Sequence, residues 1–391
     1  MKRYLKNFDL TYEFVRTSIY DCLNQQRWKR RDTAFMLADF MQLYMYENNQ
    51  PLQGKKQLAK KIQKFAYTDK TKLFKLVDYM SLKIYEEICN KKISLEPIRY
   101  EERVDGISKK IREIGISSMK QQLYDYIIVN ACKEMFKAKV GHYQCASIPL
   151  KGQVFGKGAI ETWIRTNPKK CRYIFKADIK KFYPSVDHKI LKELLARDIK
   201  NDTLLYILYT LIDTYKEGLC IGSYLCQYLA NYVLSYPYHY VSEMLYTERR
   251  GKRINLINHV LFYMDDIILF GSSKKNVKLA AKKLEKYLNE KLKLGFKPTY
   301  QLFPLDSRPI DMMGYKIYTY KTTVRKRIFN KANRTFKEAN KNMTLKQAYR
   351  VVSYNGYFRN SYSYKYIKKI NLDNTLKRAK EVISNANRNI H

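Results

Sequence analysis

Two adjacent aspartates, Asp265 and Asp266, stand between two strongly apolar runs of the chain. Residues 260–262 read Val-Leu-Phe before the pair, and residues 267–270 read Ile-Ile-Leu-Phe after it. Such runs of β-branched and aromatic residues are typical of buried strands. Two carboxylates are costly to bury beside these strands unless a cation compensates them. We therefore predict a β-hairpin whose tight turn carries both aspartates, with each flanking strand buried.

A divalent cation would supply the charge that these carboxylates need. Magnesium is the expected ion, because it binds hard carboxylate oxygens and leaves positions open for phosphate. An Asp-Asp pair is more often part of a solvated turn, but the flanks of Asp265 and Asp266 are too apolar for that interpretation. The pattern thus indicates a metal site.

A third carboxylate follows another strand-like run. Residues 173–177 read Tyr-Ile-Phe-Lys-Ala and lead into Asp178, and the aromatic pair Phe182 and Tyr183 comes shortly after. By itself, an acid at a strand end is usually a polar edge residue or a helix cap. Together with Asp265 and Asp266, Asp178 completes a carboxylate set that two magnesium ions can use for phosphoryl transfer.

The chain carries a large excess of basic residues. Its 391 residues include 75 Lys and Arg against 36 Asp and Glu, a formal net charge of +39. Such an excess repels itself unless a polyanion offsets it, so nucleic acid held through its phosphates is the expected partner. A membrane surface is the alternative, but no apolar run approaches the length of a spanning helix, and we predict no membrane association.

The cysteine pattern and the N-terminus both favour a cytoplasmic location. The seven cysteines have no Cys-x-x-Cys spacing, which argues against structural zinc and against a disulfide framework. The first residues are basic and lack the apolar core of a signal peptide.

With these motifs in view, the chain resembles reverse transcriptases. It is most similar to the prokaryotic group that includes diversity-generating-retroelement, abortive-infection and phage-defence enzymes. Residues 262–266 resemble motif C of the family, and Asp178 with Phe182 and Tyr183 resembles motif A. The resemblance implies that Asp178, Asp265 and the backbone carbonyl of Ile179 hold the metal, with Asp266 as a weaker ligand or a spectator.

The same resemblance implies an α+β right-hand polymerase with a helical N-terminal extension, fingers, palm and a short helical thumb. We expect the extension at residues 1–95, the fingers at 96–170, the palm at 171–320 and the helical thumb at 321–391. Residues 276–292 should form an amphipathic helix in the palm. Its apolar side comprises Val277, Ala280, Ala281, Leu284, Leu288 and Leu292.

Several nucleotide-binding residues are implied by position. Tyr183 stands five residues after Asp178, where the family places an aromatic gate against the ribose 2′-hydroxyl. Lys110 and Arg112 lie in a segment that alternates basic and apolar residues, like the family's fingers strand that clamps the triphosphate. Solvated surface cations are the alternative for both. Lys297 resembles the motif D lysine, although Lys293 and Lys291 are close by.

The segment 218–231 resembles motif B but departs from its usual pattern. Gly222 is retained, where the backbone must approach the incoming nucleotide or the template closely. Ile221 takes the place of the usual glutamine, and Gln227 that of the usual proline. The same departure in the diversity-generating branch accompanies permissive incorporation. A helix cap followed by a buried helix also explains Leu225 and Leu229.

Residues 312–315 resemble the primer grip, with Met313, Gly314 and Tyr315 at the hairpin that positions the primer end. The resemblance therefore implies an RNA-directed DNA polymerase that uses dNTPs and two Mg²⁺ ions. Its other partners would be an RNA template or structured noncoding RNA, and a DNA primer or product. A homo-oligomer remains compatible with the sequence.

The expected role of this polymerase is antiviral defence against phage. Three alternatives stay open: a template-independent or protein-primed DNA polymerase of abortive-infection type, a diversity-generating-retroelement enzyme, and a non-catalytic RNA-binding subunit. The last ranks lowest, because all three carboxylates are present.

Overall fold

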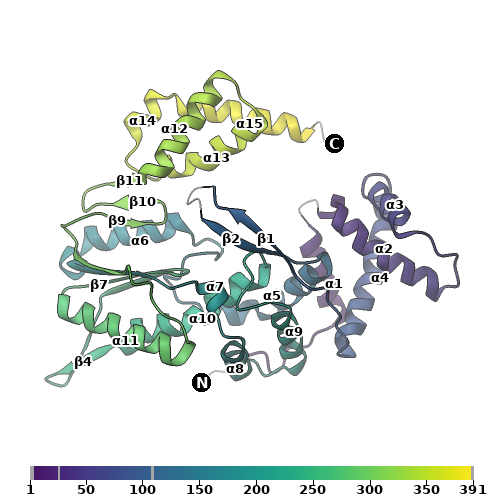
Figure 1. The fold of residues 1–391 in the computed structure, drawn as a ribbon, viewed down its shortest axis with the longest axis horizontal. Coiled ribbons are helices and arrows are strands. Elements are labelled where there is room, and N and C mark those ends of the chain that lie inside the picture. Colours follow the sequence, from purple (N-terminus) through teal and green to yellow (C-terminus); the bar gives the residue numbers. More distant parts are fainter. Residues whose placement is uncertain (1–3, 25–26, 107–109, 389–391) are drawn as a thin grey trace.

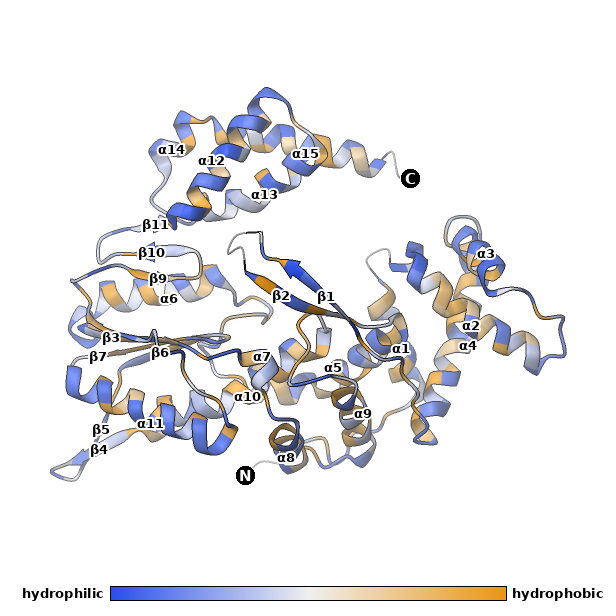
Figure 2. Cartoon of the chain, in the orientation of Figure 1, coloured by the Kyte–Doolittle hydropathy of each residue, from blue (hydrophilic) through white to orange (hydrophobic). Residues whose placement is uncertain are grey.

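The computed structural model describes residues 4–24, 27–106 and 110–388. Figure 1 shows a group of N-terminal helices on one side, a central sheet with its covering helices, and a C-terminal group of helices above the sheet. Hydrophilic residues run along α11 and α12, whereas hydrophobic ones gather where α5 and α9 meet (Figure 2).

The N-terminal helices pack through apolar stripes and a half-buried group of polar side chains. Residues such as Ile19, Leu37, Ile62 and Val77 are buried between them. Asp78 accepts hydrogen bonds from Arg16 Nε at 2.6 Å and from the Tyr20 hydroxyl at 2.9 Å, which joins the first helix to the fourth. The elements are α1 (Tyr12–Leu23), η1 (Arg27–Lys29), α2 (Arg31–Glu47), α3 (Lys55–Thr68) and α4 (Lys70–Cys89).

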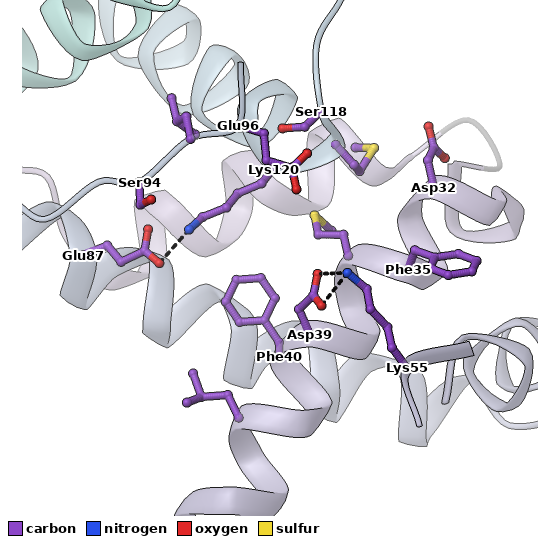
Figure 3. A pocket seen from close by; sticks show the side chains of 14 residues that line it. Asp32, Phe35, Asp39, Phe40, Lys55, Glu87, Ser94, Glu96, Ser118 and Lys120 are labelled. Atoms are coloured by element: carbon purple, nitrogen blue, oxygen red, sulfur yellow. Dashed lines mark hydrogen bonds and ion pairs between the residues drawn. The ribbon is translucent and has the colours of Figure 1, made fainter. Parts of the chain in front are cut away.

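A pocket of about 550 Å³ opens between α2, the ends of α3 and α4 and the start of the next long helix (Figure 3). Both lysines that line it are paired: Lys55 Nζ lies 2.6 Å from Asp39 Oδ1, and Lys120 Nζ lies 2.8 Å from Glu87 Oε1. None of the sequence-predicted site residues lines it. The pocket is therefore separate from the candidate site.

A long central helix, α5, connects the N-terminal group to the rest of the chain. Ser118 caps it by accepting a hydrogen bond from the Gln121 N–H, and Leu123, Ile127 and Ile128 are fully buried. An antiparallel hairpin precedes it, α9 packs beside it, and α8 packs against α9. The elements are β1 (Arg99–Val104), β2 (Ile111–Ile116), α5 (Met119–Lys139), α8 (His188–Asp198) and α9 (Asp202–Asp213).

The central sheet has four antiparallel strands in the order β6-β7-β3-β8. Because strand side chains alternate, Phe175 and Leu269 join the core on one face, while Ile174 and Ile268 join the core on the other. The helix α11 covers the first face and α6 the second. The elements are α6 (Gln153–Thr166), η2 (Pro168–Cys171), β3 (Tyr173–Asp178), β6 (His259–Tyr263), β7 (Asp266–Gly271), α11 (Lys274–Leu292) and β8 (Gln301–Pro304).

The expected amphipathic helix is confirmed as α11, and all six of its predicted apolar residues are buried. The buried flanks of the aspartate pair are confirmed as β6 and β7. By contrast, α6 packs on the central sheet through Ile160 and Trp163, although the boundary drawn at residue 170 assigns it to the fingers. Periodicity shows which side of a helix is apolar, but not which sheet that side covers.

Between the strands of this sheet the chain forms a long helix and a second hairpin. The helix contains Pro237 and continues into one turn of π-helix. The hairpin then projects from the molecule below α11 in the view of Figure 1. The elements are α7 (Phe182–Ser185), α10 (Tyr224–His239), η3 (Tyr240–Met244), β4 (Tyr246–Arg249) and β5 (Lys252–Asn255).

The C-terminal helices have a hydrophobic core of their own, which includes Ile328, Phe336 and Phe358. A small sheet in the order β11-β10-β9 leads into them, so residues 322–324 of the predicted helical thumb are strand rather than helix. The elements are β9 (Ile310–Met312), β10 (Tyr315–Ile317), β11 (Thr322–Val324), α12 (Lys326–Lys341), α13 (Leu345–Arg359), α14 (Tyr364–Lys369) and α15 (Leu372–Arg388).

No helix in the described ranges is both long and apolar enough to cross a membrane.

Candidate active site

The three aspartates meet at one end of the central sheet. Asp178 is the last residue of β3 and pairs in register with Asp266, the first residue of β7. Asp265 lies in the turn before it, and its carbonyl accepts a hydrogen bond of 3.0 Å from the Ile179 N–H. The predicted hairpin is therefore present, but its two-residue turn is Met264-Asp265, so Asp266 stands in the strand rather than in the turn.

This turn holds a strained backbone. Met264 adopts φ 52°, in the left-handed region that favours glycine. A non-glycine residue there costs about 1–3 kcal/mol, and such strain is found most often at functional sites. The pairing of Tyr263 with Asp266 on either side fixes this geometry and holds Asp265 at the tip of the hairpin.

Burial and mutual repulsion dominate the electrostatics of the three carboxylates. Asp178 and Asp266 lie close enough for each carboxyl to shift the pKa of the other. Burial and the neighbouring acids raise the pKa of Asp266 to about 7, whereas the adjacent Asp266 carboxyl and the nearby lysines lower the pKa of Asp178. Of these two carboxyls, Asp266 is therefore the more easily protonated. Burial also raises the pKa of Asp265.

Two lysines partly neutralise the cluster. Lys297 Nζ lies 3.2 Å from Asp178 Oδ2, and the Lys297 N–H donates to the Asp178 carbonyl at 2.8 Å. Lys176 Nζ lies 3.8 Å from Asp266 Oδ1. Sequence reasoning selected Lys297 but missed Lys176, although its place two residues before Asp178 puts it on the same face of β3. That spacing was the available signal.

The donor set suits a hard divalent cation. Asp178 Oδ1 is buried and has no hydrogen-bond partner among the described residues, which is an open lone pair in a cluster of excess negative charge. Carboxylate oxygens are the ligands that magnesium and calcium prefer. As the side chains stand, however, the described residues contain no group of three His, Cys, Asp or Glu side chains arranged to hold a metal ion.

Tyr183 links the aspartates to the loop before α10. Its ring is largely buried, and burial together with the charges of Cys226 and Asp265 raises the pKa of its hydroxyl. Its backbone carbonyl accepts a 2.7 Å hydrogen bond from the Leu219 N–H. Tyr183 therefore lies between the turn of Met264 and Asp265 and the loop before α10.

The loop itself is tied to the hairpin of β1 and β2. The Gly115 N–H donates to the Ile221 carbonyl at 2.8 Å. Gly222 adopts φ +118°, and a Cβ there would lie 2.6 Å from the Gly115 carbonyl oxygen, so only glycine fits. Arg112 lies on the same strand as Gly115 and is close enough to Asp265 for its charge to lower the pKa of that carboxyl.

A buried carboxylate beneath the loop was missed by sequence reasoning. Asp125 on α5 has no exposed surface, and its Oδ2 accepts a 3.0 Å hydrogen bond from the Ser223 hydroxyl and a 3.5 Å bond from the Leu225 N–H. Ser223 in turn caps α10 by accepting from the Cys226 N–H. Asp125 therefore anchors the start of the helix that follows Gly222. The only sequence signal for it is its place among the apolar residues that α5 buries.

The remaining predicted residues lie around this centre. Lys110 is exposed just before β2, outside the strand. Gln227 is half-buried on α10, and its carbonyl accepts a 3.0 Å hydrogen bond from the Asn231 side chain. Met313 and Gly314 form a two-residue turn with φ values of 53° and 86°. Tyr315 is fully buried against Tyr357 of α13, so its ring acts by packing and not by direct contact with a primer.

Residues 99–317, more than half of the chain, match the sequence profile of the family described as "Reverse transcriptase (RNA-dependent DNA polymerase)". The chain belongs to this family. It is an RNA-directed DNA polymerase, a nucleotidyltransferase with the α+β right-hand polymerase fold, and it binds an RNA template and a DNA product.

Two solved telomerase structures also resemble this reverse transcriptase. One is apo telomerase from Candida Tropicalis truncated from the C-terminal domain, with 14% identity, a TM-score of 0.43, and coverage of 69% of this chain and 68% of that one. The other is apo telomerase from Candida Tropicalis, with 12% identity, a TM-score of 0.41, and coverage of 68% and 59%. Both TM-scores are too low to transfer any further detail. No curated protein sequence matches the chain significantly.

The buried Asp125 gives the reverse transcriptase a pH-dependent stability. Burial raises its pKa to about 7 from an ordinary 3.8, so folding favours the protonated form. The stability that this group contributes is complete below about pH 4 and is lost as the pH rises to about 7. Asn cannot ionise and avoids this loss. We expect Asp125→Asn to resemble the wild type near pH 4 in thermal denaturation and to melt at a higher temperature near pH 8.

The matched control is Asp306→Asn, which removes an exposed carboxylate outside the site. Its melting temperature should follow that of the wild type at both pH values. A difference between Asp125→Asn and the wild type that does not change with pH would contradict the assignment of a raised pKa.

Proposed function

We propose that this reverse transcriptase joins dNTPs by a two-Mg²⁺ mechanism, with Asp178, Asp265, Asp266 and the Ile179 carbonyl holding the ions. The proposal rests on the geometry of the β3–β7 pairing: Asp178 lies opposite Asp266, and the Ile179 N–H donates a hydrogen bond to the Asp265 carbonyl. Bound ions would activate a primer 3′-hydroxyl and stabilise the pyrophosphate leaving group. Bound cations would favour the ionised form of Asp266, whose pKa is raised in their absence.

The residues around the aspartates have separate roles in this proposal. Arg112 would grip the triphosphate, because a guanidinium can bind phosphate with two hydrogen bonds. Lys110 would assist it from the end of the same hairpin. Lys297 would leave Asp178 when the ions bind and would then face the leaving pyrophosphate. Lys176 would stay beneath Asp266 as a fixed counter-charge.

The loop before α10 would check the nascent base pair. Gly222 allows its backbone to approach the nucleotide, and Ile221 offers an apolar side chain where the family usually has a hydrogen-bonding glutamine. Gln227 stands where the family usually has proline. Loss of that hydrogen bond supports permissive incorporation. The turn of Met313 and Gly314, packed on Tyr315, would support the primer end.

Replacing a proposed metal ligand should abolish DNA synthesis. Asp178→Asn and Asp265→Asn each remove charge stabilisation worth several kcal/mol in the transition state, so incorporation should fall by at least about 100-fold. Extension of a labelled primer on an RNA template with Mg²⁺ measures this. Calorimetry with Mg²⁺ should also show weaker ion binding by both variants.

The control for this experiment is Asp306→Asn, the same chemical change on an exposed carboxylate. It should extend the primer at the wild-type rate. Near-normal synthesis by Asp178→Asn or Asp265→Asn, in protein with a normal circular dichroism spectrum, would remove these residues from the metal site.

Tyr183 should select the sugar. Tyr183→Ala opens the space beside C2′ of the incoming nucleotide, so ribonucleotide incorporation should rise by about tenfold or more relative to dNTP incorporation, a change of about 1.4 kcal/mol in discrimination. Tyr183→Phe keeps the ring and should keep the wild-type ratio. Competition between rNTP and dNTP in single-nucleotide extension gives the ratio. An unchanged ratio in Tyr183→Ala would show that another residue is the gate.

We further propose that the enzyme belongs to the prokaryotic defence-associated group, acts in the cytoplasm and works with a cognate noncoding RNA. The excess of 75 basic over 36 acidic residues supports a large RNA partner. The resemblance of motifs A, B and C to prokaryotic enzymes supports the group. A diversity-generating role shares the isoleucine in motif B, and a template-independent or protein-primed reaction is favoured by the many tyrosines, 36 in all.

Phage challenge tests the defence role. Cells that express the wild type with its native flanking RNA should plate fewer phages, by about tenfold or more, than cells that express Asp265→Asn. Sequencing of any DNA bound to the protein would show whether synthesis copies an RNA. Equal plating on both strains across a broad phage panel would contradict the defence role, and product without a template would favour the protein-primed reaction.

A further inference from the structure

The hairpin of β4 and β5 stands out from the body of the protein (Figure 1). Its base is fixed, since the Leu256 N–H donates to the Leu245 carbonyl at 2.9 Å and both leucines are buried, with 2% and 4% of their surface exposed. Every described side chain between them is half-buried or exposed, including Ile254 at 43%. The hairpin is therefore fixed at its base, and both of its faces are accessible to solvent.

A two-stranded ribbon of this kind is at best marginally stable on its own. Its turn adds a further cost, because Arg250 adopts φ 51° before Gly251 at 71°. That conformation favours asparagine at the first position, and an arginine there is strained. The strained turn places the positive charge of Arg250 at the outermost point of the hairpin.

The chemistry of the ribbon is that of a phosphate-binding surface. Residues 246–255 include four basic residues and one acidic residue. Arg253 lies over the Tyr246 ring at 4.5 Å, and its Nε lies 3.9 Å from Glu248 Oε1, so the one acid of the ribbon is paired with Arg253. Arg250 and Lys252 form no ion pair with the described residues and project at the tip. The ribbon thus presents unneutralised positive charge on an extended arm.

The arm lies away from the three aspartates, where we place the polymerase cleft. It joins the sheet at the start of β6, whereas Asp265 follows the end of β6. Five strand residues at about 3.3 Å each separate the two ends by about 16 Å. DNA product begins at the aspartates, but an RNA template extends past the cleft before synthesis starts.

We propose that the hairpin of β4 and β5 binds the phosphodiester backbone of RNA outside the cleft, through Arg250 and Lys252. The inference rests on the proposed function, because it assumes that the enzyme works on an RNA longer than the cleft holds. The hairpin contributes affinity through its charge and carries no base-specific contact.

A double variant, Arg250→Asn with Lys252→Gln, tests this. Asparagine before glycine suits the turn, so the substitution relieves strain and keeps the hairpin folded. Binding of a long stem–loop RNA should weaken several-fold near 0.1 M salt, and the slope of log affinity against log salt should become shallower by about 1 to 2. Extension of a short template–primer that fits within the cleft should remain at the wild-type rate.

The matched control is Lys278→Gln with Lys282→Gln, which removes the same charge from the exposed side of α11. It should bind the stem–loop RNA nearly as the wild type does. Wild-type affinity and salt slope in the hairpin variant would overturn the inference, and so would an equal loss in the control variant. Loss of binding to vesicles of anionic phospholipid, with RNA binding intact, would assign the hairpin to a membrane instead.

Failure of the proposed function gives a different result. In that case the wild type itself fails to extend the short template–primer, whatever the hairpin variant does to RNA binding. Extension by the wild type with unchanged RNA binding by the variant overturns only the role of the hairpin.

Discussion

The pairing of β3 with β7 is the constraint on which the site depends. It fixes Asp178 opposite Asp266 and allows Ile179 to hold Asp265 through its backbone. Like charges at this separation repel, and the chain tolerates them because both strands are buried on both faces, by α11 and by α6. Apolar packing of α11 and α6 on the two faces of the sheet offsets the folding stability that the clustered carboxylates cost.

The same region shows how the chain holds this charge before a ligand arrives. Lys297, Lys176 and the raised pKa of Asp266 each offset part of it, and of these only Lys176 stays in place in the proposed reaction. Strain at Met264 adds to the cost. A site assembled from repulsion and strain is poised to gain free energy when cations and phosphates enter, which is the expected pattern for a phosphoryl-transfer centre.

The sequence predicts the parts of this protein that depend on local pattern. The apolar flanks of Asp265 and Asp266 predict the hairpin, and six apolar residues at helical spacing predict α11. The anchoring role of Asp125 could not be predicted, because its partner Ser223 is nearly a hundred positions away and no local pattern marks such a contact. The placement of α6 on the sheet, and of Asp266 in the strand rather than the turn, likewise depends on tertiary packing and on register.

The strand order also determines when the centre can assemble. β3 lies between β7 and β8, so Tyr173 pairs with Gly271 on one side and with Pro304 on the other. Pairings so distant in sequence are slow to form, because a long loop must close first. During synthesis on the ribosome, the N-terminal helices and α5 can fold while β3 still lacks both neighbours. The aspartates therefore come together late. A ribosome-bound chain that ends before β7 has no polymerase centre, although most of its helices are in place.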